Sequence, residues 1–417
     1  MRSDLDAIMQ ANDIDALLIT GPAQHNPAMV YFTGVCHLSM ADLIKKRGEP
    51  PVLFHTAMER GEAAAAAEQN GLTMRGLSQY PYKERIQTAH GDPVGAEALR
   101  YCQMLTDLGI TAGRVALYGQ GSLNTAFPVF YELQKRMPDI VLVGDLGDIV
   151  LGTAMITKED VEIDRIRRMG KITTEVVGQT ADFLTSRRVQ DGVLMDSNDQ
   201  PLTLGRVKGL INLWLAERGA EAPEGTIFTI GRDAALPHSM GNPTDLMRLG
   251  QTIVFDIFPC EMGGGYFYDF TRTWSLGYAT DEAQALYDQV LTVYQTLMRE
   301  LKTGAQFSDY QNRACELFEA MGHATPRTDP DTETGYVHGI GHGVGLAVHE
   351  RPSSSLLNAS PEDKLMPQVV FTVEPGLYYP ERGMGLRLED TVWARPDGNF
   401  EILAEYPLDF VLPVRKN

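Results

Sequence analysis

The chain has 417 residues, 43% of them hydrophobic, and a formal net charge of −19 at pH 7. This length can bury sizeable hydrophobic cores, and we expect two domains. The negative charge argues against a nucleic-acid backbone or an anionic membrane as a partner, because both would repel the protein. The amino terminus has no apolar signal-like segment, and the chain has no run of about 18 apolar residues, so we expect a cytoplasmic protein.

The first 155 residues alternate between helix-like and strand-like segments. We expect helices at 4–12, 59–69 and 94–107 and strands at 16–20, 30–34, 51–54 and 114–118. Such alternation predicts an α/β layer sandwich. We assign His25, His37, His55 and His90 to surface or core positions, and we expect Cys36, Cys102, Cys260 and Cys315 to be reduced thiols, because their spacing shows no CxxC pair.

A second domain should begin near residues 150–155, which places the two domains at 1–155 and 156–417. Thr157-Lys158-Glu159-Asp160 has the pattern of a capping box, and the apolar residues that follow recur on one helical face. Further helices are expected at 204–218, 282–301 and 308–321, with a strand at 225–231.

The segment His338–Glu350 holds three of the nine histidines. His338 and His342 are four residues apart, as in a helical metal-binding pair. Four glycines within this stretch would cost a helix roughly 3–4 kcal/mol relative to alanine. Because the glycines alternate with larger residues, we expect extended backbone, in which the two histidines lie roughly 13 Å apart. At most one of them can then bind a given metal ion.

Four carboxylates lie in or beside apolar, strand-like runs: Asp256, Asp269, Glu374 and Glu389. A buried, isolated carboxylate costs several kcal/mol, so such a group pairs with a cation or binds a metal. Any one of the four could form a structural ion pair, which is the role we expect for Asp390 and Arg272. Together with the histidines, they predict a metal site.

These residues resemble the ligand set of the pita-bread metallopeptidases, a family that includes methionine aminopeptidase, aminopeptidase P, prolidase and the metal-free creatinase. The resemblance covers about residues 157–417 and rests on Asp-Phe-Thr-Arg-Thr, His-Gly-Ile-Gly-His-Gly-Val-Gly-Leu, Thr-Val-Glu-Pro-Gly and Arg-Leu-Glu-Asp-Thr, in that order. It implies an α+β pita-bread catalytic domain after an α/β amino-terminal domain of the creatinase/prolidase type. The interval between Asp256 and Asp269 is longer than is usual in the family, so we expect a small loop at 259–265.

The resemblance also implies a binuclear metal centre. Asp256 would bind one ion, Asp269 and Glu389 would bridge both ions, and His342 and Glu374 would complete the other. Oxygen-rich ligation with one imidazole suits Mn²⁺, which the family favours, and is also compatible with Co²⁺, Fe²⁺ or Zn²⁺. Cys260 is expected to be a neighbouring thiol and not a ligand.

Roles for the remaining residues follow from the same resemblance. Glu374 would also carry a proton from the attacking water to the leaving nitrogen. His349 and His338 would bind substrate or the oxyanion, and His238 occupies the place of a substrate-side histidine. Arg387 could pair with a site carboxylate or with the carboxylate of a substrate.

The function implied is hydrolysis of the N-terminal Xaa-Pro bond of dipeptides or short peptides by a hydroxide that bridges the two metals. One alternative is a non-peptidase hydrolase or lyase on the same scaffold, such as a creatinase-like C–N hydrolase. Another is a binding module without catalysis. A homodimer is expected by analogy with the family.

Overall fold

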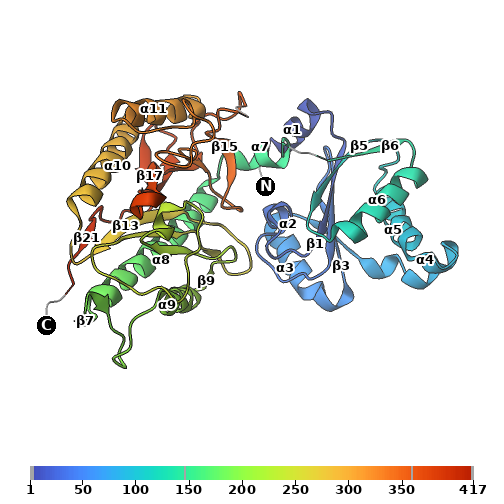
Figure 1. Ribbon diagram of the computed structural model, residues 1–417. Coiled ribbons are helices and arrows are strands. Elements are labelled where there is room, and N and C mark those ends of the chain that lie inside the picture. Colours follow the sequence, from blue (N-terminus) through green and yellow to red (C-terminus); the bar gives the residue numbers. More distant parts are fainter. Residues whose placement is uncertain (1–3, 145–146, 358–359, 415–417) are drawn as a thin grey trace. The chain divides into compact units, whose positions relative to one another are not determined.

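The computed structural model describes residues 4–144, 147–357 and 360–414. Its contacts divide the chain into two compact units. The amino-terminal unit contains residues 1–154 together with Gly263–Gly265, and the carboxy-terminal unit contains Met155–Met262 and Tyr266–Asn417. Figure 1 colours the chain in sequence order, from blue at the amino terminus to red at the carboxy terminus.

The amino-terminal unit is built on a six-stranded mixed sheet with the order β4-β3-β2-β1-β5-β6. β1 is antiparallel to β2 and parallel to β5. Residues of these strands pack against α5 in a core that includes Leu18, Phe54 and Met104. The strands are β1 (Ala16–Gly21), β2 (Ala41–Lys46), β3 (Val52–His55), β4 (Thr73–Gly76), β5 (Gly113–Gly119) and β6 (Ile140–Val143). The helices are α1 (Leu5–Ala11), α2 (Pro27–Thr33), α3 (Arg60–Asn70), α4 (Tyr82–Thr88), α5 (Pro93–Asp107) and α6 (Leu123–Arg136), and α7 (Leu151–Ile156) follows them.

One expectation for this unit is wrong, because residues 30–34 form no strand. They lie in α2 and its carboxy-terminal cap. Pro27 occupies the first turn of the helix, and the Asn26 side chain accepts a hydrogen bond from Met29 N at 3.4 Å. This start signal outweighs the β-propensity of the aromatic and β-branched residues that follow it.

Four long helices surround the sheets of the carboxy-terminal unit (Figure 1). They are α8 (Asp160–Thr185), α9 (Leu204–Ala216), α10 (Asp281–Glu300) and α11 (Phe307–Ala320). The capping box of α8 is displaced from the predicted Thr157, since Glu159 is the N-cap and pairs reciprocally with Glu162. Thr157 instead forms a β-bridge with Val369.

The sheets of this unit bring distant segments together. One sheet has the order β10-β11-β13-β21, a second has the order β15-β14-β16-β19-β20, and β17 pairs with β18. A bridge between Thr271 and Glu389 joins the β13 segment to the residue that precedes β19. The strands are β10 (Ile227–Ile230), β11 (Thr252–Ile257), β13 (Phe270–Leu276), β14 (His342–Gly343), β15 (Glu350–Ser353), β16 (Val370–Val373), β17 (Gly376–Tyr379), β18 (Met384–Arg387), β19 (Asp390–Ala394), β20 (Phe400–Ile402) and β21 (Val411–Leu412). Two short pairs complete the unit: β7 (Val189–Gln190) with β8 (Val193–Leu194), and β9 (Ala220–Glu221) with β12 (Cys260–Glu261).

The alternating glycines of 338–349 do not form the long extended strand that we expected. Regular pairing is limited to His342 and Gly343. A Cβ atom at Gly341 would lie 2.1 Å from Thr372 O, and one at Gly343 would lie 2.0 Å from Arg351 O. These glycines therefore permit close approach to neighbouring backbone, which fixes His342 between two chain segments.

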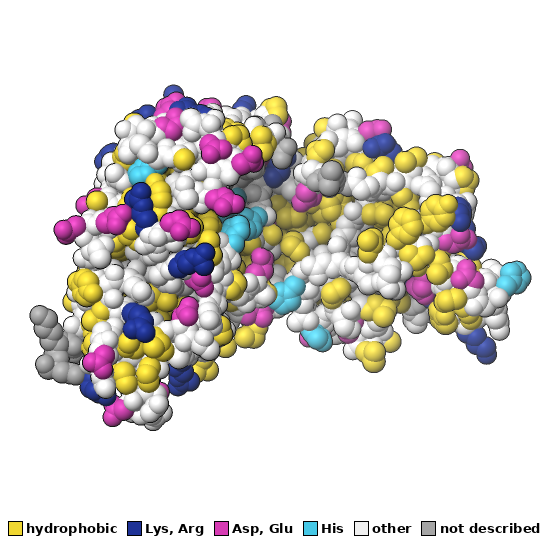
Figure 2. All heavy atoms as spheres, viewed as in Figure 1, with side chains coloured by type: hydrophobic (Ala, Val, Ile, Leu, Met, Phe, Trp, Pro, Cys, Tyr) yellow, Lys and Arg dark blue, Asp and Glu magenta, His cyan; other side chains and the backbone are white. Residues whose placement is uncertain are grey.

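Figure 2 and the helices bear on the charge and the apolar character of the protein. Acidic and basic side chains are interspersed on the face in Figure 2, and that face shows no basic patch among the described residues. No described helix combines the length and apolar character needed to cross a membrane.

Candidate metal centre

The four carboxylates and His342 come from separate segments of the carboxy-terminal unit and line one cavity of about 680 Å³. Asp256 lies on β11, Asp269 directly precedes β13, Glu374 directly follows β16 and Glu389 directly precedes β19. β11 and β13 are adjacent and antiparallel, and Asp256 is in register with Thr271. The longer interval between the two aspartates therefore leaves both of them on the wall of the same cavity. We call Asp256, Asp269, Glu374 and Glu389 the carboxylate cluster.

His342 lies within this cluster. Its Nε2 is 3.5 Å from Asp269 Oδ2 and 3.5 Å from Glu374 Oε1. Its Nδ1 lies 3.1 Å from Gly343 O, and a carbonyl can only accept, so Nδ1 carries the hydrogen. The lone pair of Nε2 is then directed toward the carboxylates, which is the arrangement of a metal-binding histidine whose other nitrogen is held by backbone.

The donor set fits divalent cations. Ligand atoms of Asp269, His342 and Glu389 all lie within 4.8 Å of one another. Asp256 Oδ1 and Glu389 Oε1 are buried and have no hydrogen-bond partner among the described residues. An unpartnered buried carboxylate oxygen is costly unless a cation faces it.

The raised pKa values of the carboxylate cluster also indicate that the site fits divalent cations. Burial, and then repulsion by Asp256 and Glu374, raises the pKa of Asp269 well above its ordinary value. Burial and repulsion by Asp269 likewise raise the pKa of Glu389. Burial raises the pKa of Glu374 to about 8 against the opposing effect of Arg387. Without added cations, the site therefore disfavours the charged form of these carboxylates.

Arg387, at the end of β18, uses its donors inside the protein. It donates to Asp256 Oδ2, to the hydroxyl of Tyr378 at 2.6 Å and to Thr271 Oγ1 at 3.3 Å. Of the two roles that the sequence left open, the structure shows pairing with a site carboxylate. The Tyr378 hydroxyl also lies 2.9 Å from His338 Nε2, so it links the arginine to that histidine.

Three further histidines line the cavity: His238, His338 and His349. Burial, followed by the charge of Arg387, lowers the pKa of His338 to about 3, so this ring is neutral at pH 7. His338 is not part of the close group formed by Asp269, His342 and Glu389, and its Nδ1 lies 3.9 Å from Glu374 Oε2.

The His349 ring contacts the His342 ring, with ring centroids 4.2 Å apart, and His238 lies in the exposed loop after β10. Burial lowers the pKa of His349, whereas the charge of Glu224 raises it.

Sequence reasoning missed three residues of this cavity network: Thr271, Tyr378 and Glu224. Thr271 donates to Glu389 Oε2 at 2.7 Å and so orients that carboxylate. Its position two residues after Asp269 was a usable signal, because alternate residues of a strand share a face. No local pattern marks Tyr378 or Glu224, whose positions depend on tertiary contacts.

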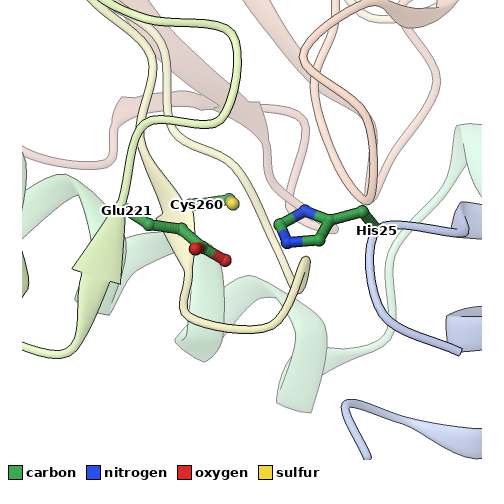
Figure 3. Close-up of side chains that lie close together, drawn as sticks. All are labelled: His25, Glu221 and Cys260. Carbon is green, nitrogen blue, oxygen red and sulfur yellow. The ribbon is translucent and has the colours of Figure 1, made fainter. Parts of the chain in front are cut away.

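Figure 3 shows the side chains of His25, Glu221 and Cys260. Cys260 and Glu221 are partners across β12 and β9 within the carboxy-terminal unit. His25 belongs to the amino-terminal unit. Cys260 is buried and does not line the cavity, and its role as a thiol that binds no metal stays a prediction.

The fold and this cluster define the class of a metal-dependent hydrolase. Residues 164–396 match the model of metallopeptidase family M24, and they include the carboxylate cluster, His342 and the other predicted site histidines. The chain therefore belongs to metallopeptidase family M24, and the predicted family is confirmed. The family implies divalent metal ions, and the donor set described above fits them.

Individual relatives support this assignment. The chain is 28% identical over 255 residues to the Xaa-Pro dipeptidase of Pyrococcus furiosus, covering 61% of this chain and 64% of the relative. It is 25% identical over 392 residues to the Xaa-Pro dipeptidase of Pyrococcus horikoshii, covering 94% and 93%. The X-Pro aminopeptidase structure from Thermotoga maritima superposes with a TM-score of 0.72 at 24% identity, over 98% of this chain and 99% of that chain. This likeness confirms the predicted two-part fold class. In three relatives, the aligned part spans only 47%, 60% and 64% of the relative's length.

The raised pKa values predict how the stability of the metal-free protein depends on pH. A carboxyl group with a raised folded pKa binds a proton that the unfolded chain releases, so its contribution to stability is lost as pH rises toward the folded value. For Glu374 this loss extends from its ordinary value of 4.5 to about 8. The lowered pKa values of His338 and His342 act in the opposite sense, but only below their ordinary value of 6.5. We therefore expect the Tm of the chelator-treated protein to fall between pH 6.5 and pH 8.

Differential scanning calorimetry measures this change. The Glu374→Gln variant should show a smaller fall, and saturation with Mn²⁺ should abolish it, because bound cations favour the ionised carboxylates. A Tm that rises with pH across this window in the metal-free protein would contradict the assignment of raised pKa values to the cluster.

Proposed function

We propose that the protein is a metallopeptidase that hydrolyses the bond between an N-terminal residue and a following proline in dipeptides or short peptides. The observation that carries the proposal is the carboxylate cluster with His342, whose buried and partly unpartnered oxygens line a cavity large enough for a short peptide. The proline preference is supported by the two relatives named Xaa-Pro dipeptidase.

The proposed metal ligands are Asp256, Asp269, His342, Glu374 and Glu389. Their four negative charges match two divalent cations, and oxygen-rich ligation favours Mn²⁺, with Co²⁺, Fe²⁺ or Zn²⁺ as alternatives. When bound, such ions polarise the scissile carbonyl and lower the pKa of water. Arg387 and Thr271 hold Asp256 and Glu389 in place by the hydrogen bonds described above.

Glu374 is the proposed proton carrier. Its Oε1 faces His342 and its Oε2 faces His338, so the carboxylate lies at the edge of the cluster and beside the cavity. It would accept the proton of the attacking water and deliver it to the leaving nitrogen. The nitrogen of an amide, prolyl or not, must gain a proton before the C–N bond breaks, because an amide anion is a poor leaving group.

The histidines of the cavity would hold the substrate. No described residue forms a hydrogen bond with the exposed His349 ring, so its N–H can donate to the oxygen of the attacked carbonyl. His338 hydrogen-bonds Gly339 O and the Tyr378 hydroxyl, so we assign it to shaping the pocket next to Glu374. His238 is proposed to contact the substrate from the loop after β10.

Kinetics on a small peptide set test the reaction. With saturating Mn²⁺, we expect kcat/KM for Ala-Pro and Ala-Pro-Ala to exceed that for Ala-Ala by at least ~10-fold, on the scale at which pockets discriminate substrates by shape. Equal rates for Ala-Ala and Ala-Pro would remove the proline preference. If no peptide is hydrolysed, the non-peptidase hydrolase or lyase becomes the leading function.

The proposal includes a homodimer and a cytoplasmic location, both expected from the sequence. Light scattering after size-exclusion chromatography tests the first, and cell fractionation tests the second.

A further inference from the structure

Glu224 lies on the wall of the same cavity, outside the carboxylate cluster. It occupies the turn Ala222–Gly225, which ends just before β10 and is closed by a 3.0 Å hydrogen bond from Gly225 N to Ala222 O. Pro223 limits the backbone on one side of Glu224. On the other side, Gly225 has φ +88°, and a Cβ there would lie 2.7 Å from Met240 Cε. The turn therefore fixes the backbone from which the Glu224 side chain reaches the cavity.

The carboxylate of Glu224 differs from those of the cluster on this wall because it is exposed. Among the described residues, no lysine, arginine or histidine lies within ion-pair distance of it, and no group donates a hydrogen bond to it. Because Glu224 is exposed, its charged form stays hydrated when the cavity contains only water. The carboxylate is therefore available to a ligand that enters the cavity.

The charges of the cavity indicate what such a ligand brings. Arg387 is the one lysine or arginine among the lining residues, and its guanidinium already pairs with Asp256. The four negative charges of the carboxylate cluster would be balanced by two divalent ions. Glu224 has no cation of its own within ion-pair distance among the described residues, so a cationic group of the ligand is favoured beside it and an anionic group is repelled.

We propose that Glu224 is a specificity-determining residue that binds an alkylammonium group of the substrate. This inference rests on the proposed peptidase function. The ammonium has two possible sources: the free amino terminus, which every substrate carries, or the side chain of a lysine at the first position. In either case, Glu224 contributes to substrate binding and takes no part in the proton transfer.

The test compares Ala-Pro, Met-Pro and Lys-Pro on the Mn²⁺-loaded wild type, Glu224→Gln and Glu224→Lys. We expect Glu224→Gln to raise KM about 3–10-fold with little change in kcat, the effect of losing an ion pair that acts equally on bound substrate and transition state. Glu224→Lys should raise KM further. If KM rises equally for all three peptides, the amino terminus is the group bound. If only the KM for Lys-Pro rises, the side chain is the group bound.

Salt dependence separates a charge effect from a structural one. The KM of the wild type should rise with ionic strength more steeply than that of Glu224→Gln, because screening weakens only an interaction that is present. Glu217→Gln is the matched control, since Glu217 is exposed in the same unit but does not line the cavity. Glu224→Asp should recover part of the lost affinity.

Calorimetric binding of Lys-Pro and Ala-Pro to Glu374→Gln, with and without Glu224→Gln, separates this inference from the proposed reaction. If the wild type hydrolyses no peptide but Glu224 still governs binding, the proposed reaction fails and the inference stands. If peptides are hydrolysed and Glu224→Gln matches the wild type in KM and salt dependence for all three, the inference is overturned and the reaction stands.

Discussion

Replacing Glu374 with glutamine should lower kcat for Ala-Pro by ~10²-fold or more, within the range of general acid–base catalysis. Glutamine keeps the size of the side chain but cannot accept a proton at pH 7. The position is suited to proton transfer, because the Glu374 carboxylate lies beside the cavity, with Oε1 facing His342 and Oε2 facing His338. Steady-state kinetics with saturating Mn²⁺ measure the effect.

The controls must separate proton transfer from metal binding, because Glu374 is also a proposed ligand. The metal content of the variant is measured under the conditions of the assay, and only the fully loaded protein is compared. Glu381→Gln is a matched variant, since Glu381 lies in an exposed turn of the same unit and outside the cavity. Near-wild-type turnover in fully loaded Glu374→Gln would show that another group carries the proton.

The second large effect concerns the two histidines that are four residues apart. We expect the His342→Ala variant to lose at least ~10-fold more affinity for Mn²⁺ than the His338→Ala variant. Loss of the contacts that support a metal ligand typically costs at least ~10-fold in metal affinity, and loss of the ligand itself should cost no less. The structure places His342 Nε2 at 3.5 Å from both Asp269 and Glu374. His338 instead directs Nε2 to the hydroxyl of Tyr378.

Calorimetric titration of the metal-free proteins with Mn²⁺ provides the affinities. His323→Ala is a useful control for the general effect of removing an imidazole, because His323 is hydrogen-bonded to Gln289 and Tyr379 away from the cavity. Equal loss of affinity in His338→Ala and His342→Ala would place both rings on the ions and overturn the distinction between them.

The sequence by itself determined the types of residue in the centre and the helices that surround it. A carboxylate inside an apolar run can be recognised as a candidate site residue from the sequence, because a charge in such a context requires a partner. Long amphipathic helices such as α10 and α11 were located to within a residue or two, since their periodicity is a local property. The family followed from the order of four short motifs.

Tertiary structure decided the rest. The alternating glycines of 338–349 predict an extended strand, but Gly341 and Gly343 are required by backbone segments that approach from Thr372 and Arg351. The pairing of Arg387 with Asp256 joins residues 131 positions apart. Glu224 reaches the cavity only because β10 pairs with β11 and places Ile227 opposite Asp256. Periodicity and residue chemistry are encoded locally, whereas register and close backbone approach depend on which distant segments pack together.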